Sequence, residues 1–379
     1  MLTPFHITDA RILRPDGLST APLGLAGGLL SEATPGRAVS LPGWLVLPGI
    51  VDLHGDGFER HLAPRRGAMR DLRQGLCATE AELAANGITT AVLAQFWSWE
   101  GGMRGPDFAL AMLAALAEMP GAFTTDLRAQ LRVETHLIDD YPRIAEAIAR
   151  FGVGYVVFND HLPHAALAAG RSVPRLVGQA LKSGRSPEAH RQLIEALHGR
   201  GGEVPEAVTA LAADLAARGL RLGSHDDANA AARALWRGRG VRISEFPESL
   251  AAAEAATMAG DAVVMGAPNL LRGGSHAGHV AAAEVVRAGF CDALASDYHY
   301  PAPRLAALAL VAEIGWPAAW ALVSERPAGL LGLTDRGRLL PGLRGDLVIL
   351  DPESGVVGAT LAAGEIRYAA GTVAAALIG

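Results

Sequence analysis

Eight short apolar runs along the middle of the chain constrain its fold more than any other feature. Each has strand character and is followed by a turn or by a helical stretch rich in Ala and Leu, such as 107–119, 141–151 and 204–219. Runs that are apolar almost throughout are typical of parallel strands buried on both faces. Eight strand–helix units over roughly 250 residues predict a (β/α)8 TIM barrel. The runs are 49–54, 89–95, 131–137, 154–160, 220–225, 241–246, 262–267 and 292–298.

A doubly wound open sheet is the alternative, since it also alternates strands with helices. No G-x-G-x-x-G fingerprint follows the first strand to support a dinucleotide-binding sheet of that kind. We therefore expect the α/β core to close into a barrel, with functional side chains at the carboxyl ends of its strands.

The two ends of the chain differ from its middle. Residues 1–48 and 336–379 hold short apolar segments separated by frequent Gly and Pro, a pattern typical of β-hairpins. We expect both ends to form one small β-sandwich domain, next to a barrel domain at 49–335. Residues 162–203 are rich in Arg, Ser and Gly, and we expect a long irregular connection there, of the kind that forms lids or binding segments.

Composition argues against several classes of protein. The 379 residues carry a formal net charge of −6, which disfavours a general nucleic-acid or anionic-membrane surface. We find no apolar stretch that predicts a membrane span and no secretion signal, and the two cysteines lack metal-ligand spacing, so a cytoplasmic protein is expected. Lys182 is the only lysine among 33 cationic residues, and no Gly-Lys-Ser/Thr phosphate loop is present.

Side chains that can bind a metal ion fall at the predicted ends of five strands. The carboxyl ends of barrel strands form the active-site face, and alternate residues of a strand point the same way, so an H-x-D pair can face one centre. A lone His is more often a structural hydrogen-bonding group and a lone Asp a helix N-cap, but their common position favours a shared role. Imidazoles with carboxylates suit one or two divalent ions such as Zn²⁺. The candidate ligands are His54, Asp56, Glu134, His161, His225 and Asp297.

A divalent cation at these strand ends would lower the pKa of bound water to roughly 7 and supply hydroxide at neutral pH. Asp297, on the last strand, is the candidate catalytic base that accepts the proton of this water. Glu134 is the candidate bridge between two ions. A carbamylated lysine is the usual alternative bridge, but Lys182 lies in the long connection and ends no strand.

Cationic and hydrogen-bond-donating groups follow two of these strands and are the candidate substrate-binding residues. Arginine binds phosphate through a planar fork of donors, and a glycine-permitted turn can hold an anion. The alternatives are a solvated charged loop at 59–66 and a turn capped by Ser275 that leads into a helix at 279–289. The candidates are Arg60, His61, Arg65, Arg66, Arg272, Ser275, His276 and Tyr298.

Several motifs resemble the amidohydrolase superfamily, and the resemblance covers nearly the whole chain. They are LPGIVDLHGD, GITTAV, the Asp that closes the eighth strand and GRLLPGLRGDLVILDP. Five segments resemble, more narrowly, the PhnM type of hydrolase from the carbon–phosphorus lyase pathway for alkylphosphonates. These segments are 52–67, 158–164, 224–229, 243–247 and 266–298.

This resemblance implies a metal-dependent hydrolase barrel that carries a small β-sandwich built from both termini. The implied reaction is water attack on the triphosphate of α-D-ribose 1-methylphosphonate 5-triphosphate, with release of pyrophosphate. The implied partner is this small phosphorylated molecule, and a homodimer is left open. The implied metal and base residues are His54, Asp56, Glu134, His161, His225 and Asp297.

The chain departs from the PhnM type around the expected site. Gly55 and Gly57 stand where the family usually has Thr and Asn. His164 ends a D-H-L-P-H run where the family usually reads D-H-T-P-G-Q, and the pair His299-Tyr300 is also unexpected. These differences concern the surroundings of the site, so they bear on the substrate more than on the metal chemistry.

His161 and His225 fall on the fourth and fifth strands, one earlier than the superfamily norm. Either a strand is missing from the count, or one of these histidines is not a ligand.

Two other functions also stay open. A deaminase or N-acyl amide hydrolase of the same fold would have an apolar or carboxylate-lined pocket, whereas arginines favour phosphate. A non-catalytic binding protein is disfavoured by retention of Asp297.

Overall fold

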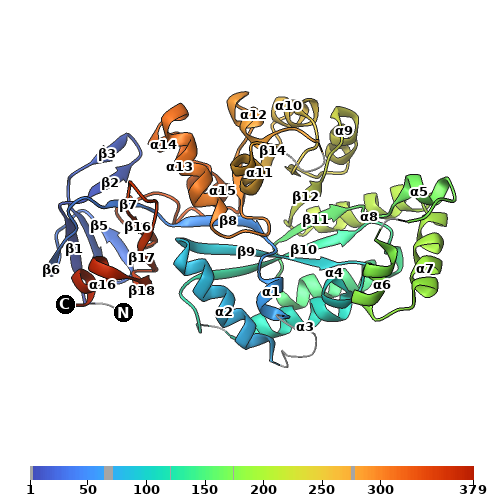
Figure 1. Ribbon diagram of the computed structural model, residues 1–379, viewed down its shortest axis with the longest axis horizontal. Coiled ribbons are helices and arrows are strands. Elements are labelled where there is room, and N and C mark those ends of the chain that lie inside the picture. The colour runs from blue at the N-terminus through green and yellow to red at the C-terminus, as the bar shows by residue number, and fades with distance from the viewer. Residues whose placement is uncertain (1–2, 64–70, 120, 174, 275–277) are drawn as a thin grey trace. The chain divides into compact units, whose positions relative to one another are not determined.

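The computed structural model describes residues 3–63, 71–119, 121–173, 175–274 and 278–379 (Figure 1). The chain divides into two compact units. The first unit comprises Met1–Leu93, Met119–Arg128 and Val264–Gly379, and the second comprises Ala94–Glu118 and Ala129–Val263.

Eight strands form one sheet whose order follows the order of the chain. They are β8 (Ile50–Gly55), β9 (Ile88–Trp97), β10 (Asp126–Glu134), β11 (Tyr155–Asn159), β12 (Arg221–His225), β13 (Ile243–Glu245), β14 (Ala262–Gly266) and β15 (Ala293–Ala295). Pairing is parallel, as between β8 and β9 and between β11 and β12. Beyond β15, Asp297 forms a parallel bridge with Gly55, which joins the two edge strands. This is the predicted TIM barrel, not an open sheet.

The eight predicted runs are the eight strands, so within the described residues the count misses no barrel strand. All ten residues of β9 are buried, as expected for a strand covered on both faces. The third run, 131–137, was predicted to begin and end too late, since β10 spans Asp126–Glu134. β10 ends at Glu134 because the chain turns there, with the Leu137 N–H donating to the Glu134 carbonyl at 3.1 Å, and His136 therefore lies outside the strand.

Helices follow the strands, and four of the described helices begin at polar caps. Asp71, Ser186, Asn229 and Ser249 accept hydrogen bonds from main-chain N–H groups in the first turns of four of them. The predicted helices 107–119, 141–151 and 204–219 are found within two residues of their expected bounds, and the one at 279–289 is shorter. The helices are α1 (Glu59–Leu62), α2 (Leu72–Ala85), α3 (Pro106–Ala117), α4 (Tyr141–Phe151), α8 (Val204–Ala217), α9 (Ala230–Gly238), α10 (Leu250–Met258), α11 (Ala267–Arg272), α12 (Ala282–Arg287), α13 (Ala302–Ile314), α14 (Trp316–Ala321) and α15 (Glu325–Leu330).

The connection 162–203 is not irregular, contrary to the prediction. It holds α5 (His164–Ala168), α6 (Leu176–Ser183) and α7 (Pro187–Gly199). Its apolar residues form a small core of their own, in which Leu162, Ile194 and Leu197 pack with Trp99. The frequent Gly and Arg residues had indicated a loop. Gly184, however, is in the left-handed conformation that ends helix α6.

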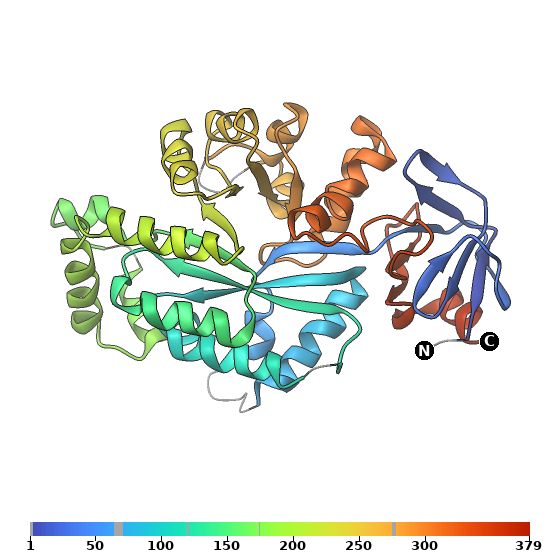
Figure 2. The same cartoon turned by 180° about the vertical axis from the view of Figure 1, so that it is seen from behind.

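Strands from the two ends of the chain form two further sheets in the first unit, with the orders β5-β4-β1-β6 and β18-β17-β16-β7-β2-β3 (Figures 1 and 2). β7 pairs with β16 in antiparallel fashion, so residues 45–48 and 347–350 share one sheet. Both ends also share one apolar core, which includes Phe5, Ile7, Leu361 and Val373. The domain bounds 1–48 with 336–379 and 49–335 remain a prediction. The strands are β1 (Phe5–Thr8), β2 (Arg11–Arg14), β3 (Gly17–Ser19), β4 (Leu23–Ala26), β5 (Leu29–Ser31), β6 (Arg37–Ser40), β7 (Leu45–Pro48), β16 (Leu347–Leu350), β17 (Val357–Ala362) and β18 (Glu365–Ala369), followed by helix α16 (Gly371–Ile378).

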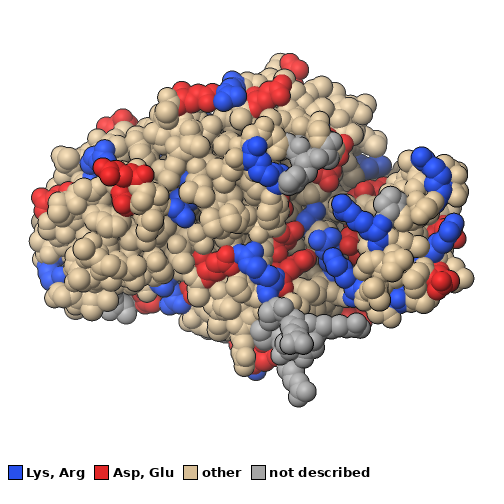
Figure 3. Space-filling model, viewed as in Figure 1, with Lys and Arg blue, Asp and Glu red and all other residues tan. Residues whose placement is uncertain are grey.

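The surface drawn in Figure 3 mixes basic and acidic side chains. This agrees with the modest formal net charge of −6. Among the described residues, no helix has the length and apolar character needed to cross a membrane.

Candidate active site

His54, Asp56 and Asp297 lie together in the first unit, where the eighth barrel strand meets the first. His54 is fully buried near the end of β8, and its carbonyl accepts the main-chain N–H of Asp297 at 2.9 Å. The Asp297 carbonyl in turn accepts the N–H of Asp56 at 2.9 Å. The main chain therefore fixes Asp297 beside the H-x-D pair.

A buried polar contact reinforces this junction of strands. Asp52 is fully buried and accepts hydrogen bonds from the main-chain N–H of Ser296 at 2.9 Å and from its hydroxyl at 2.5 Å. Burial raises the pKa of Asp52 above its ordinary value, although the hydrogen bonds from Ser296 oppose the shift. Asp52 thus ties β8 to the residue just beyond β15, two positions before the candidate ligand His54.

Tyr300 accounts for two of the departures from the PhnM pattern. Its side chain is fully buried. The ring would lie 2.9 Å from a β-carbon placed on Gly55 and 3.2 Å from one on Gly57, and Asp52 and Ser296 also crowd Gly55. A Thr at position 55 would overlap these groups, so Gly55, Gly57 and Tyr300 form one packing arrangement and their substitutions are linked.

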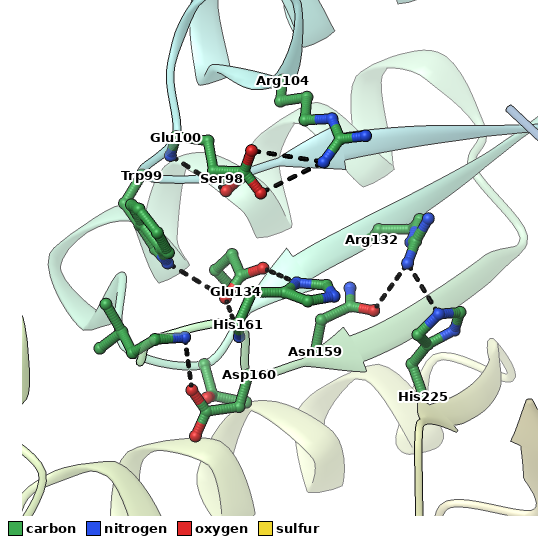
Figure 4. Close-up of polar contacts among 12 residues, drawn as sticks. Ser98, Trp99, Glu100, Arg104, Arg132, Glu134, Asn159, Asp160, His161 and His225 are labelled. Atoms are coloured by element: carbon green, nitrogen blue, oxygen red, sulfur yellow. Dashed lines mark hydrogen bonds and ion pairs between the residues drawn. The ribbon is translucent and has the colours of Figure 1, made fainter. Parts of the chain in front are cut away.

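Glu134 and His161 form the centre of the polar cluster in the second unit (Figure 4). Glu134 is fully buried, and its two oxygens contact the His161 ring Nδ1 at 2.5 Å and the His161 main-chain N–H at 3.1 Å. The indole N–H of Trp99 donates to the same carboxylate at 3.3 Å. Burial acts to raise the pKa of Glu134, but the charge and hydrogen bonds of His161, together with the charge of Arg132, outweigh it, and the pKa lies below its ordinary value.

His225 and Glu245 lie on the neighbouring strands of the same unit. The Nη2 group of Arg132 lies 2.9 Å from His225 Nε2 and 3.5 Å from Asn159 Oδ1 (Figure 4). A guanidinium only donates, so Nε2 accepts this hydrogen bond and the ring proton resides on Nδ1. Nδ1 faces Glu245 Oε2 at 3.5 Å. The carboxylate of Glu245 thus lies on the side of the His225 ring that carries the proton.

Glu245 is held by two further donors. Its Oε1 accepts from the side-chain amide of Gln130 at 2.8 Å and from the hydroxyl of Tyr155 at 2.5 Å, all in a fully buried setting. Burial and the charge of Glu245 raise the pKa of Tyr155 well above its ordinary value, so this hydroxyl keeps its proton. His161 and His225 lie with their ring centres 6.2 Å apart.

Unusual backbone conformations mark the ends of three strands. Among the described residues, six non-glycine residues have positive φ, and three of them lie at the ends of barrel strands: Asp226 at 60° directly after β12, Phe246 at 54° directly after β13, and Asp297 at 54° two residues beyond β15. For a bulky residue such as Phe246 this conformation is costly, and such strain clusters at functional sites. The Phe246 ring packs against His225 with 5.0 Å between ring centres.

The described substrate-binding candidates gather around Tyr298 in the first unit. Arg60 Nη1 donates to the Tyr298 carbonyl at 3.1 Å, and Arg272 contacts the Tyr298 hydroxyl. Arg60 and His61 both contact Glu82, which is the partner that sequence patterns did not suggest. The candidates Arg65, Arg66, Ser275 and His276 lie outside the described residues.

Sequence reasoning missed Arg132 and Glu245. Glu245 is the last residue of the sixth strand. Its position at a strand end is the signal in the sequence that could have indicated it. Arg132 sits within the apolar third strand, and its 4% exposure is evident only from the fold. Its guanidinium lies over the ring of Phe96, 3.9 Å from the ring centre.

Sequence similarity to one characterised protein shows the family to which this chain belongs. The protein alpha-D-ribose 1-methylphosphonate 5-triphosphate diphosphatase from Escherichia coli (strain K12) is 36% identical to this chain over 334 residues. The matched region covers 84% of the chain and 85% of the E. coli protein. The chain belongs to the PhnM family. A search of family models found none that matches this PhnM-family chain.

Solved structures with low sequence identity share the fold of the PhnM-family chain. N-acetylglucosamine-6-phosphate deacetylase from Pasteurella multocida is 11% identical, with a TM-score of 0.63 over 96% of this chain and 99% of its own. A Xaa-Pro dipeptidase with bound methionine is 13% identical, with a TM-score of 0.64 over 97% and 100%. An adenosine deaminase from Xanthomonas campestris with bound zinc is 13% identical, with a TM-score of 0.54 over 99% and 96%.

These neighbours are members of the amidohydrolase superfamily, and the PhnM-family chain shares their barrel. Family membership makes the chain a hydrolase. Within the described residues no barrel strand is missing from the count, and metal binding by both His161 and His225 stays a prediction. His161 lies two residues beyond the fourth strand, His225 is the last residue of the fifth, and the sixth strand of this PhnM-family chain ends in Glu245.

Proposed function

We propose that this chain is a diphosphatase that hydrolyses α-D-ribose 1-methylphosphonate 5-triphosphate in alkylphosphonate catabolism. The observation that carries the proposal is the 36% identity, over 84% of the chain, to the E. coli enzyme of that name. Water adds to the first phosphorus of the triphosphate and the anhydride bond to the second phosphate breaks. The products are the 5-monophosphate and pyrophosphate.

We further propose a divalent cation, zinc for preference, as the cofactor. The donor chemistry fits such an ion: in the second unit the buried Glu134 carboxylate lies beside the His161 imidazole, and the His225 imidazole lies with its Nδ1 3.5 Å from Glu245 Oε2. When bound, the cation would supply Lewis acidity and lower the pKa of its water to roughly 7. The residues that would hold one or two ions are His54, Asp56, Glu134, His161, His225 and Asp297.

The protein's own groups then have separate tasks. The side chain of Asp297 accepts the proton of the attacking water and returns it to the leaving pyrophosphate. Its main chain is fixed by His54 and Asp56, which limits the freedom of the carboxylate. Glu245 keeps His225 in one tautomer, a role that carboxylates commonly have behind a histidine ligand.

Arg60 and Arg272 are proposed to bind the polyphosphate. Both are tied to Tyr298, one through its carbonyl and the other through its hydroxyl, so a single residue holds both cations. Guanidinium groups bind phosphate oxygens in pairs and neutralise charge on the leaving group. An amide or amidine substrate would not require them.

Pyrophosphate release tests the proposal. The purified protein is depleted of metal with a chelator, reloaded with Zn²⁺, and supplied with α-D-ribose 1-methylphosphonate 5-triphosphate, with ATP, and with a panel of N-acyl amides and aminopurines. We expect pyrophosphate from the ribosyl triphosphate only with metal restored. Ammonia or carboxylate release from the panel, without pyrophosphate from the triphosphate, would establish the C–N hydrolase instead.

A further inference from the structure

A second group of imidazoles and a carboxylate lies in the second unit and includes none of the candidate ligands named above. It consists of His136, just beyond β10, Asp160, just beyond β11, and His164, the first residue of α5. One potential ligand atom from each of these three residues lies within 4.8 Å of the others. His198, in the last turn of α7, contacts the group through His164.

The distances within this group resemble the edges of a metal coordination shell. His164 Nε2 lies 3.0 Å from both oxygens of Asp160, and His136 Nδ1 lies 3.6 Å from Asp160 Oδ1. Ligand atoms around a tetrahedral Zn²⁺ with bonds of about 2.0–2.1 Å are about 3.3–3.4 Å apart. The separations from Asp160 bracket that value, and the ligand atoms of His136 and His164 lie within 4.8 Å of each other.

His198 supplies the outer contact that a histidine ligand usually needs. The two Nδ1 atoms of His164 and His198 are 2.8 Å apart, so one ring donates and the other accepts. With Nε2 of His164 given to a metal, its Nδ1–H donates to His198. Histidine ligands commonly donate their second nitrogen in this way, which fixes the ring orientation.

The burial of the group also suits ion binding. His136 is 5% exposed in its side chain, whereas Asp160 and His164 are 40% and 38% exposed. One ligand is therefore fixed in the interior, and the other two leave a path for an ion and a position for water. The rings of His136 and His164 already lie with their centres 4.9 Å apart.

We propose that His136, Asp160 and His164 form a second site for a divalent transition-metal ion, with His198 as the partner of His164. Two imidazole nitrogens select Zn²⁺, Ni²⁺ or Cu²⁺ over Mg²⁺ and Ca²⁺, which prefer oxygen ligands. The ion joins the start of α5 to the end of β10 and, through His198, to α7. His164 stands where the PhnM type usually has Gly, so the site is a feature of this chain.

Metal counting tests this inference independently of catalysis. Metal-free full-length protein is dialysed against buffered Zn²⁺, and bound zinc is measured by mass spectrometry for the wild type, His164→Asn and Asp160→Asn. We expect each variant to lose about one zinc per chain relative to the wild type. His6→Asn, in β1 of the terminal sheet, is the matched control and should bind the wild-type amount.

A second measurement covers the case in which a variant folds poorly. Anomalous diffraction at the zinc edge from wild-type crystals should give a peak bounded by the three side chains. Unchanged zinc content in both folded variants, or a zinc-loaded crystal with no peak there, overturns the inference. The diphosphatase proposal would survive that result, because it depends on Glu134 and Asp297 and not on this group.

Discussion

The main-chain N–H of Asp297 donates to the carbonyl of His54 at 2.9 Å, so a residue of the eighth strand end is bound directly to the first candidate ligand of the chain. Asp297 adopts φ 54° to do so. Asp and Asn tolerate this left-handed conformation better than other non-glycine residues. The left-handed backbone conformation and the proposed role as proton acceptor therefore both favour an aspartate at position 297.

Replacement of the Asp297 carboxylate by an amide separates its role as proton acceptor from its role in the left-handed backbone conformation. Asp297→Asn should lower turnover by about 10²–10⁴-fold, because the proton acceptor is lost. The melting temperature should stay close to that of the wild type, since Asn retains the left-handed backbone. Pyrophosphate release and differential scanning fluorimetry measure the two effects.

Asp297→Ala should instead lose both activity and stability, because Ala is strained at positive φ. Asp16→Asn, at an exposed position of the terminal hairpin, is the matched control and should change neither. Near-normal turnover in Asp297→Asn would remove the residue from its proposed role as base.

Glu245→Gln tests the residue that the sequence did not suggest. Removal of its charge should weaken metal binding by about 10–100-fold, because a charged partner of His225 is lost. Competition with a chelator of known affinity measures this change. Glu254→Gln, exposed on α10, provides the control, and equal metal affinity in both variants would show that Glu245 only packs against its neighbours.

Arg272→Ala should raise the KM for the triphosphate more than it lowers kcat. A lost charged hydrogen bond is worth about 1.5–3 kcal/mol, which corresponds to roughly 10–150-fold. Tyr298→Phe should have a smaller effect, since it releases Arg272 without removing its charge. Arg287 pairs with the exposed Glu313, and Arg287→Ala should leave KM unchanged. If KM rose as much in Arg287→Ala as in Arg272→Ala, the cause would be a general electrostatic effect.

Trp320 supports the first unit without any part in catalysis. It is fully buried, and its indole N–H donates to the Pro48 carbonyl at 2.9 Å. Trp320→Ala should reduce the free energy of unfolding by about 3–5 kcal/mol, because it removes a large buried ring. Urea denaturation measures the loss, and the partly exposed Trp316→Ala should cost clearly less. Equal midpoints for the two variants would contradict the assigned packing role.

Acid stability should depend on Asp126. Burial acts to raise its pKa, but Arg128 and Arg336 outweigh this and hold the pKa below its ordinary value. The ionised carboxylate therefore stabilises the fold at pH above its unfolded pKa of about 3.9, and this contribution fades as the pH falls toward the folded value. Asp126→Asn should lower the melting temperature at pH 7 and matter much less near pH 3.

The control for this pH experiment is Asp107→Asn, since the Asp107 side chain is 93% exposed although it pairs with Arg143. Its melting temperature should follow the wild type at every pH. A difference between Asp126→Asn and wild type that persists unchanged down to pH 3 would show that charge is not the cause.

Local sequence patterns were sufficient for the barrel but not for the connection after its fourth strand. Runs with few charged residues, such as 89–95, are typical of strands buried on both faces, so they identify strands without knowledge of their neighbours. In 162–203, by contrast, helices of 5, 8 and 13 residues are separated by glycines and arginines. Their stability comes from packing on Trp99, which no local pattern contains.

The sequence by itself determined the strand order, the polar strand ends and the family, because these depend on periodicity and on motifs that are contiguous in the chain. Only the tertiary structure decided which groups meet. Arg132 reaches His225 across 93 positions, and Gln130 reaches Glu245 across 115. Such pairs arise from the register of parallel strands, a relation between distant segments that no single stretch of sequence encodes.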